Sequence, residues 1–164
     1  MRDLKLLRRL SYLALAIAYL QIVFGAIVRI SNSGFGCGDH WPKCAGNWFP
    51  PLDRPDLIIE LTHRYLAVTV TVAIGLLLVA AFRRRAEPAV GGRGGVLNAA
   101  LLATTLVVTA ALFGAITVKM QLNPFIIVVH LAIAMSLLAT LAAAAMRTGG
   151  LGAASLAGPP ATKS

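Results

Sequence analysis

The sequence has few charged residues and long runs without any. Only 13% of its 164 residues are charged and 58% are hydrophobic, whereas soluble domains carry about a quarter charged residues. A membrane-spanning helix needs about 20 mostly apolar residues, and four stretches qualify: roughly Leu10–Val28, Leu57–Phe82, Val96–Val118 and Pro124–Met146. A chain this short could not hide four such stretches in a soluble core. The composition therefore excludes a soluble domain and predicts an all-α membrane protein with four transmembrane helices.

Acidic residues are scarce, with six Asp and Glu against fifteen Lys and Arg, for a net charge of +9. If the helices alternate in direction, ten basic residues lie on one side: Arg2, Lys5, Arg8, Arg9, Arg83, Arg84, Arg85, Arg93, Arg147 and Lys163. The other five lie on the opposite side, mixed with four acidic residues. This positive-inside pattern argues against a nucleic-acid partner. It predicts a multi-pass protein of the cell membrane with both termini cytoplasmic and anionic lipid as a neighbour.

Three parts follow from this topology. Residues 1–9 form a basic cytoplasmic N-terminus, and residues 10–146 form a transmembrane domain whose external loop covers residues 29–56. Residues 147–164, rich in Gly, Ala and Pro, are predicted to be a disordered cytoplasmic tail. Between the second and third helices, the glycine-rich stretch 91–95 is predicted to be a flexible linker.

Cysteine is also rare. Cys37 and Cys44 are the only two, and their C-x6-C spacing is neither the redox C-x-x-C motif nor a zinc knuckle. Both lie in the predicted external loop, where disulfides persist. Gly36, Gly38 and Pro42 allow the chain to curl back between them. A disulfide that acts as a structural staple is therefore expected, while a redox role would require a strained or exposed bond.

A short repeat links the two halves of the chain. FGAIVR closes the first apolar stretch at residues 24–29, and FGAITVK closes the third at residues 113–119. Each is followed by an external loop and then by a helix with one histidine in its second turn, His63 or His130. The pattern predicts a bundle built from two repeated helical hairpins, related by an axis along the membrane normal. His63 and His130 would then face each other at similar depth.

Two facing histidines in an apolar bundle favour axial ligation of a heme iron. The heme propionates would require cations near the membrane edge, and Arg29, Arg64 and Lys119 lie at the right height. The alternative is that both histidines simply form hydrogen bonds to loop backbone.

A di-iron site is excluded by its ligand count. Glu60 and His63 form one E-x-x-H pair, but Ile127 stands three residues before His130, and no other predicted helix carries a carboxylate. Because Glu60 has no counterpart in the second hairpin, it is expected to take part in proton transfer at the edge of the cofactor. The alternative is that Glu60 is an ordinary carboxylate in the first turn of its helix, where it faces water or pairs with Arg64.

Three motifs together resemble the heme A synthase family over about residues 10–146. They are the segment GAIVR at 25–29, the loop motif G-x-G-C-x3-W-P-x-C at 34–44, and ELTHR at 60–64, followed by His130. The resemblance implies a bundle of membrane helices with bis-histidine heme sites. It also implies oxidation of the C8 methyl group of heme O toward the formyl group of heme A.

Carried over residue by residue, the resemblance implies that His63 and His130 bind the heme iron. Glu60 would be the catalytic acid, and Cys37 and Cys44 would form the external disulfide. Typical members have eight helices in two halves, whereas this chain has one half. The presence of the glutamate and the cysteine pair makes it similar to the N-terminal, substrate-heme half.

The sequence thus favours a heme A synthase-like membrane oxidoreductase, expected to be a homodimer. The bound heme would be heme O or heme A as substrate or product, or heme b. The alternatives are a non-catalytic b-type cytochrome and a heme-handling or assembly subunit of a terminal oxidase. Heme O synthase and the terminal oxidase assembly are the further partners considered.

Overall fold

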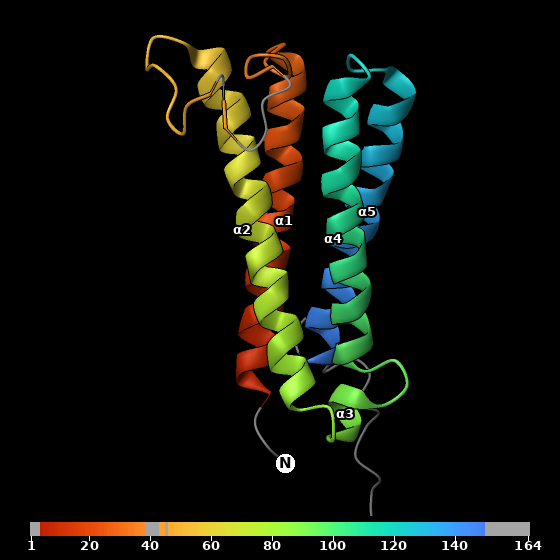
Figure 1. Ribbon diagram of the computed structural model, residues 1–164. Coiled ribbons are helices and arrows are strands. Elements are labelled where there is room, and N and C mark those ends of the chain that lie inside the picture. Colours follow the sequence, from red (N-terminus) through yellow and green to blue (C-terminus); the bar gives the residue numbers. More distant parts are fainter. Residues whose placement is uncertain (1–3, 39–42, 45, 150–164) are drawn as a thin grey trace, which may run out of the picture.

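The chain folds into four long helices and a short one (Figure 1). The computed structural model describes residues 4–38, 43–44 and 46–149. The helices are α1 (Lys5–Ile30), α2 (Pro55–Arg83), α3 (Pro88–Gly91), α4 (Val96–Lys119) and α5 (Pro124–Arg147). Apart from an isolated bridge between Cys44 and Asn47, the described residues contain only helices and loops.

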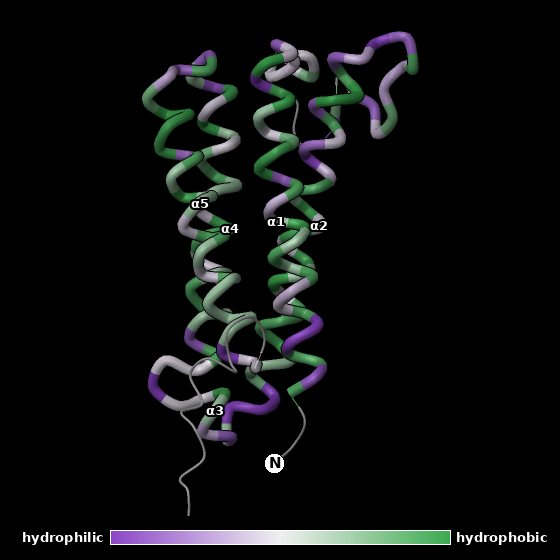
Figure 2. The backbone as a smooth tube through the Cα atoms, turned by 180° about the vertical axis from the view of Figure 1, so that it is seen from behind, coloured by the Kyte–Doolittle hydropathy of each residue, from purple (hydrophilic) through white to green (hydrophobic). Residues whose placement is uncertain are grey.

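Helices α1, α2, α4 and α5 are each long and apolar enough to cross a membrane. Figure 2 shows that their lengths are mostly hydrophobic, while hydrophilic residues gather at the ends of the bundle and in the loops. The prediction of an all-α integral membrane protein with four spanning helices is confirmed.

Local chemistry explains where two of the helices begin. Pro55 opens α2 and Asp56 occupies its first turn, where proline needs no N–H partner and a carboxylate suits the helix dipole. Pro124 opens α5, and the Asn123 side chain caps that helix by accepting a hydrogen bond from the Phe125 N–H at 3.0 Å. The start of α5 is the expected Pro124, and α2 begins two residues before the expected Leu57.

The outer bounds of the bundle differ from those expected. Helix α1 begins at Lys5 rather than Leu10, because the Leu7 side chain is fully buried in the bundle. Helix α5 continues to Arg147, and the Thr148 hydroxyl then donates to the Ala145 carbonyl at 2.7 Å. The rest of the predicted tail, residues 150–164, lies outside the described residues.

The glycine-rich stretch is a compact turn rather than an extended linker. Helix α3 packs Val90 fully into the core, and the chain doubles back closely around it. A Cβ atom on Gly91 would overlap the Arg85 carbonyl, and one on Gly95 would overlap the Val90 carbonyl. The glycines therefore allow close backbone packing, which composition alone does not distinguish from flexibility.

The four long helices form a four-cornered bundle. Helix α1 packs against α2 and α5, and α4 packs against α5 and α2, so α2 and α5 occupy opposite corners. We call the end of the bundle that carries α3 the α3 end, and the end that carries residues 31–54 and 120–123 the loop end (Figure 1). This connectivity agrees with two successive hairpins, while their origin as a repeat stays a prediction.

Packing differs sharply between the two ends. A continuous buried core fills the half toward the α3 end, and small alanine side chains there let the helices approach closely. It consists of Leu7, Ala14, Ala18, Val70, Ala73, Ile74, Leu77, Ala81, Val90, Val96, Ala100, Ala103, Val107, Leu137 and Leu141. By contrast, the described segments 19–30, 62–69, 111–119 and 124–136 contain no fully buried residue. The half of the bundle toward the loop end is therefore loosely filled.

Candidate functional site

Two histidines lie in the loosely filled half. His63 lies on α2 and His130 on α5, the helices at opposite corners of the bundle. Both are partly buried. The structure thus places both side chains in the same half of the bundle, while their facing each other across a ligand stays a prediction.

A glycine on the neighbouring helix makes room for each ring. A Cβ atom on Gly25 of α1 would lie 3.1 Å from His63 Cε1, and one on Gly114 of α4 would lie 3.4 Å from His130 Cε1. These are the glycines of the two matching FGAI segments. Each hairpin therefore places a histidine against a glycine of its own first helix.

The ring nitrogens suit a ligand role. Nδ1 of His63 and Nδ1 of His130 are both buried, and neither has a hydrogen-bond partner in the described structure. A buried polar atom without a partner costs about 1–3 kcal/mol, so bound iron would relieve a real penalty. No cluster of three or more His, Cys, Asp or Glu among the described residues could hold a bare metal ion. Two imidazoles fit a porphyrin iron, because the porphyrin supplies the remaining ligands.

Gly25 yields a test of this geometry. At 3.1 Å from His63, an added methyl group forces the ring to move, and overpacking of this kind costs about 1–3 kcal/mol. We expect Gly25→Ala to weaken heme binding by about tenfold, measured by heme titration of the purified protein. Gly114→Ala, with the looser 3.4 Å approach, should weaken it less.

The control for this pair is Gly75→Ala on α2. No atom lies within 4 Å of a Cβ built there, so heme binding should be unchanged. Equal losses for Gly25→Ala and Gly75→Ala would contradict the proposed place of His63 in the site.

Glu60 is buried, with 4% of its surface exposed. Its Oε2 accepts a hydrogen bond from the Cys37 backbone N–H at 2.7 Å. Its Oε1 accepts one from Arg64 Nη2 at 2.5 Å, so an ion pair joins two side chains one turn apart on α2. Glu60 therefore does not face water, and it connects α2 to the loop that precedes this helix.

Arg64 extends this connection. Its Nη1 donates to the Lys43 carbonyl at 3.1 Å and its Nη2 lies 3.4 Å from the Gly38 carbonyl. Together, Glu60 and Arg64 hold both ends of the cysteine loop against α2. Of the predicted propionate partners, Arg64 thus already binds the loop, whereas Arg29 and Lys119 stand exposed in the last turns of α1 and α4.

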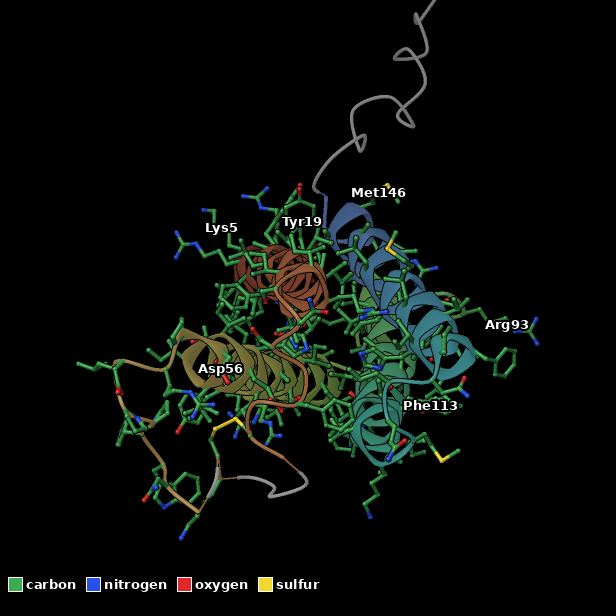
Figure 3. The ribbon with its side chains drawn as sticks, turned by 90° about the horizontal axis from the view of Figure 1, so that it is seen from above. Lys5, Tyr19, Asp56, Arg93, Phe113 and Met146 are labelled. Carbon is green, nitrogen blue, oxygen red and sulfur yellow. A yellow bond between two sulfur atoms is a disulfide. The ribbon has the colours of Figure 1, made fainter. Side chains whose placement is uncertain are left out.

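The predicted disulfide is present. Cys37 and Cys44 are bonded, with their Cα atoms 4.4 Å apart, and Figure 3 shows the bond beside α2. Both cysteines are 1% exposed and pack on Leu57 and Leu61. The bond therefore holds the loop on the first turns of α2. His40 and Trp41, within the same loop, lie outside the described residues.

Removing the disulfide should destabilise the protein measurably. The double variant Cys37→Ser with Cys44→Ser is expected to lose about 2.5 kcal/mol of unfolding free energy, the entropy that so short a closed loop removes from the unfolded chain. Chemical denaturation in detergent measures this loss. The parent protein in reductant should match the variant, and a parent insensitive to reductant would count against a stabilising bond.

An open apolar pocket of about 210 Å³ lies between α2 and the loop that precedes it. It is lined by Phe49, Pro50, Leu52, Ile58, Leu61, Thr62 and Tyr65. The Tyr65 hydroxyl donates to the Trp48 carbonyl at 2.6 Å and fixes the loop beside it. By helical spacing the pocket occupies a face of α2 different from that of His63.

Gln21 is the site residue that sequence reasoning missed. Its side-chain Nε2 lies 3.3 Å from His63 Nε2. The available signal was its position, because a polar residue inside an apolar span is costly and is more often functional than incidental.

Comparisons with known proteins indicate the family. The model of the cytochrome oxidase assembly protein family, COX15-CtaA, matches residues 8–57 and 54–163. A heme A synthase of Geobacillus kaustophilus is 32% identical over 114 residues, covering 70% of this chain and 34% of that protein. A heme A synthase of Lysinibacillus sphaericus is 32% identical over 116 residues, covering 71% of this chain and 36% of that protein.

A third relative differs in name. A protoheme IX farnesyltransferase of Thermus thermophilus is 39% identical over 99 residues, covering 58% of this chain and 15% of that protein. No solved structure matches the chain. The chain spans about a third of the length of the heme A synthases it matches. By the match of the family model over most of its length, the chain belongs to the heme A synthase family of cytochrome oxidase assembly proteins.

Proposed function

We propose that the protein is a membrane oxidoreductase of heme A biosynthesis that oxidises the C8 methyl group of heme O toward the formyl group of heme A. The observation that carries this proposal is the pair of buried imidazoles, each with an unpaired ring nitrogen, in a half of the bundle that protein side chains leave loosely filled. A region in which side chains form no complete core of their own suits a large flat apolar ligand.

His63 and His130 would hold the heme from opposite corners of the bundle, and the apolar helices would exclude water from it. Arg29 and Lys119 are the exposed cations at the loop end that could meet the heme propionates. The heme iron, when bound, supplies the redox chemistry. The protein supplies position and a dry environment.

Glu60 is the proposed acid–base group. Oxidation of a methyl to a formyl group, with the oxygen atom taken from water, releases protons and electrons, so a carboxylate near the reacting edge could accept a proton. Arg64 pairs directly with this carboxylate. The electrons would pass to an acceptor outside the chain.

A second candidate is a non-catalytic b-type cytochrome or heme-handling subunit of a terminal oxidase. One observation favours it: both carboxylate oxygens of Glu60 already have partners, in Cys37 and Arg64. Glu60 could then serve only to hold the external loop. An electron carrier needs the two histidines but has no evident need of the carboxylate.

Spectroscopy and heme extraction separate these functions. The purified protein should give a bis-histidine low-spin spectrum on reduction, and chromatography should identify heme O or heme A in cells that supply heme O. Absence of bound heme would overturn both functions. Heme b alone, without conversion of supplied heme O, would favour the cytochrome.

We further propose a homodimer as the working unit. The relatives are about three times longer than the part matched here, and a second copy would supply a second four-helix bundle. Light scattering in detergent, with the heme content per chain, tests this assignment. A monomer that converts heme O would refute it.

The remaining proposals concern the protein's partners and its orientation in the membrane. A related segment occurs within a protein named protoheme IX farnesyltransferase, which supports heme O synthase as the source of substrate, with terminal oxidase assembly as the destination. Basic residues gather at the α3 end and the disulfide lies at the loop end. Both features support cytoplasmic termini and an external loop.

A further inference from the structure

Gln21 presents a hydrogen-bonding group to His63 from the facing helix. Its amide nitrogen lies 3.3 Å from His63 Nε2, and its amide oxygen is buried without a partner in the described structure. Gln21 and Gly25 are four residues apart, so one face of α1 supplies both the hydrogen bond and the space for the ring. Burying an amide with one group unpaired is costly, which a simple packing role would not explain.

The other hairpin lacks this side chain. When the two FGAI segments are aligned, Gln21 corresponds to Ala110. An alanine offers no side-chain hydrogen bond to a histidine, whereas a glutamine amide can donate or accept one. The two hairpins therefore give their histidines chemically different neighbours.

We propose that Gln21 is a positioning residue for His63: with its amide oxygen turned toward Nε2, it accepts a hydrogen bond from the Nε2–H and leaves Nδ1 bare for the iron. A neutral imidazole carries one N–H and one bare nitrogen, and only the bare nitrogen binds a metal. The partner of the other nitrogen sets the tautomer and the ring orientation. This inference rests on the proposed function, because it takes His63 as an axial ligand.

The consequence is an asymmetric site. Of the two histidines, His63 is the one with a side-chain amide within hydrogen-bond distance in the described structure. Because the Gln21 amide is uncharged, it can orient His63 without placing a charge beside the ring. His63 can then present a bare nitrogen to an incoming heme. Gln21 also tunes how strongly His63 donates electrons to the iron.

The first test uses heme-free protein. Histidine labelled with ¹⁵N in the ring allows NMR to distinguish the two tautomers, and only three histidines are present. We expect His63, assigned through His63→Ala, to show one tautomer in the parent and a mixture in Gln21→Leu. The signals of His40 and His130 should not change.

Ser11→Ala is the matched control. Ser11 is another buried polar residue of α1, and it is fully buried toward the α3 end. Its removal should leave all three histidines unaltered. An unchanged His63 tautomer in Gln21→Leu would overturn the proposal. If Gln21→Leu loses its helical circular dichroism, Gln21→Met, which keeps length and flexibility, replaces it.

The second test uses heme-loaded protein. Gln21→Leu should retain bound heme but shift its electron paramagnetic resonance g values and its midpoint potential. Gln21→Glu, which keeps an acceptor, should shift the potential to a lower value than that of the parent. A parent that binds no heme, yet has a His63 tautomer that depends on Gln21, would refute the proposed function alone. Loaded variants identical to the parent would refute the positioning role alone.

Discussion

Replacing either His63 or His130 with alanine is expected to abolish the low-spin heme spectrum. Each imidazole offers a buried ring nitrogen without another partner, and loss of one leaves the iron with a single protein ligand. The reduced-minus-oxidised spectrum of purified variants measures the effect. Bound heme should become high-spin or be lost during purification.

Cavity rescue sharpens this test. In His63→Gly and His130→Gly, added imidazole should restore the low-spin spectrum, because the small molecule can occupy the site of the lost ring. His40→Ala serves as the matched histidine control and should keep the parental spectrum. If both alanine variants remain low-spin, the assignment of the two axial ligands is wrong.

Replacing Glu60 with glutamine is expected to preserve bound heme while lowering conversion of heme O by about a hundredfold. This is the lower end of the range expected when a general acid–base group is lost. Glutamine keeps an oxygen that can accept from the Cys37 N–H, but it cannot exchange a proton. Chromatography of hemes extracted from cells that express the variant measures the conversion.

Comparison with Glu60→Asp separates chemistry from loop anchoring. Aspartate keeps the acid but is too short to hold both Cys37 and Arg64 in the present geometry. Activity in the aspartate variant together with inactivity in the glutamine variant supports proton transfer. Full activity of Glu60→Gln or Glu60→Ala would remove Glu60 from the chemistry and favour the cytochrome.

Glu60→Ala is a less specific test, because it is expected to lower stability as well as activity. The Arg64 side chain is 13% exposed and the Glu60 side chain 5% exposed, so deleting the carboxylate leaves a largely buried guanidinium unpaired. Breaking such a pair costs about 3 kcal/mol. Lost activity in the alanine variant must therefore be read beside a measurement of its stability.

The elements that sequence predicted well are those governed by local patterns. Each membrane span follows from a continuous apolar run, and proline and asparagine mark helix starts at Pro55 and Asn123. The disulfide followed from only two cysteines, Cys37 and Cys44, in one external loop. Short-range chemistry decides all of these features.

The contacts that could not be predicted from the sequence depend on which faces of the helices and loops pack together. Nothing local indicates that the Glu60 carboxylate accepts the Cys37 N–H, because that bond joins a helix to a loop 23 residues earlier. Likewise, Gln21 reaches His63 across 42 residues of chain. The compact turn at α3 was missed because glycine permits both tight packing and flexibility.

The uneven packing of the bundle would link heme occupancy to the lifetime of the protein in the cell. The core at the α3 end is complete without a ligand. The loop end would gain further packing contacts when heme binds. By mass action, a ligand at a hundred times its dissociation constant adds about 2.7 kcal/mol to stability. An empty molecule would therefore open first at the loop end. Membrane proteases could then remove unloaded copies and spare loaded ones, so heme supply would set the abundance of the protein.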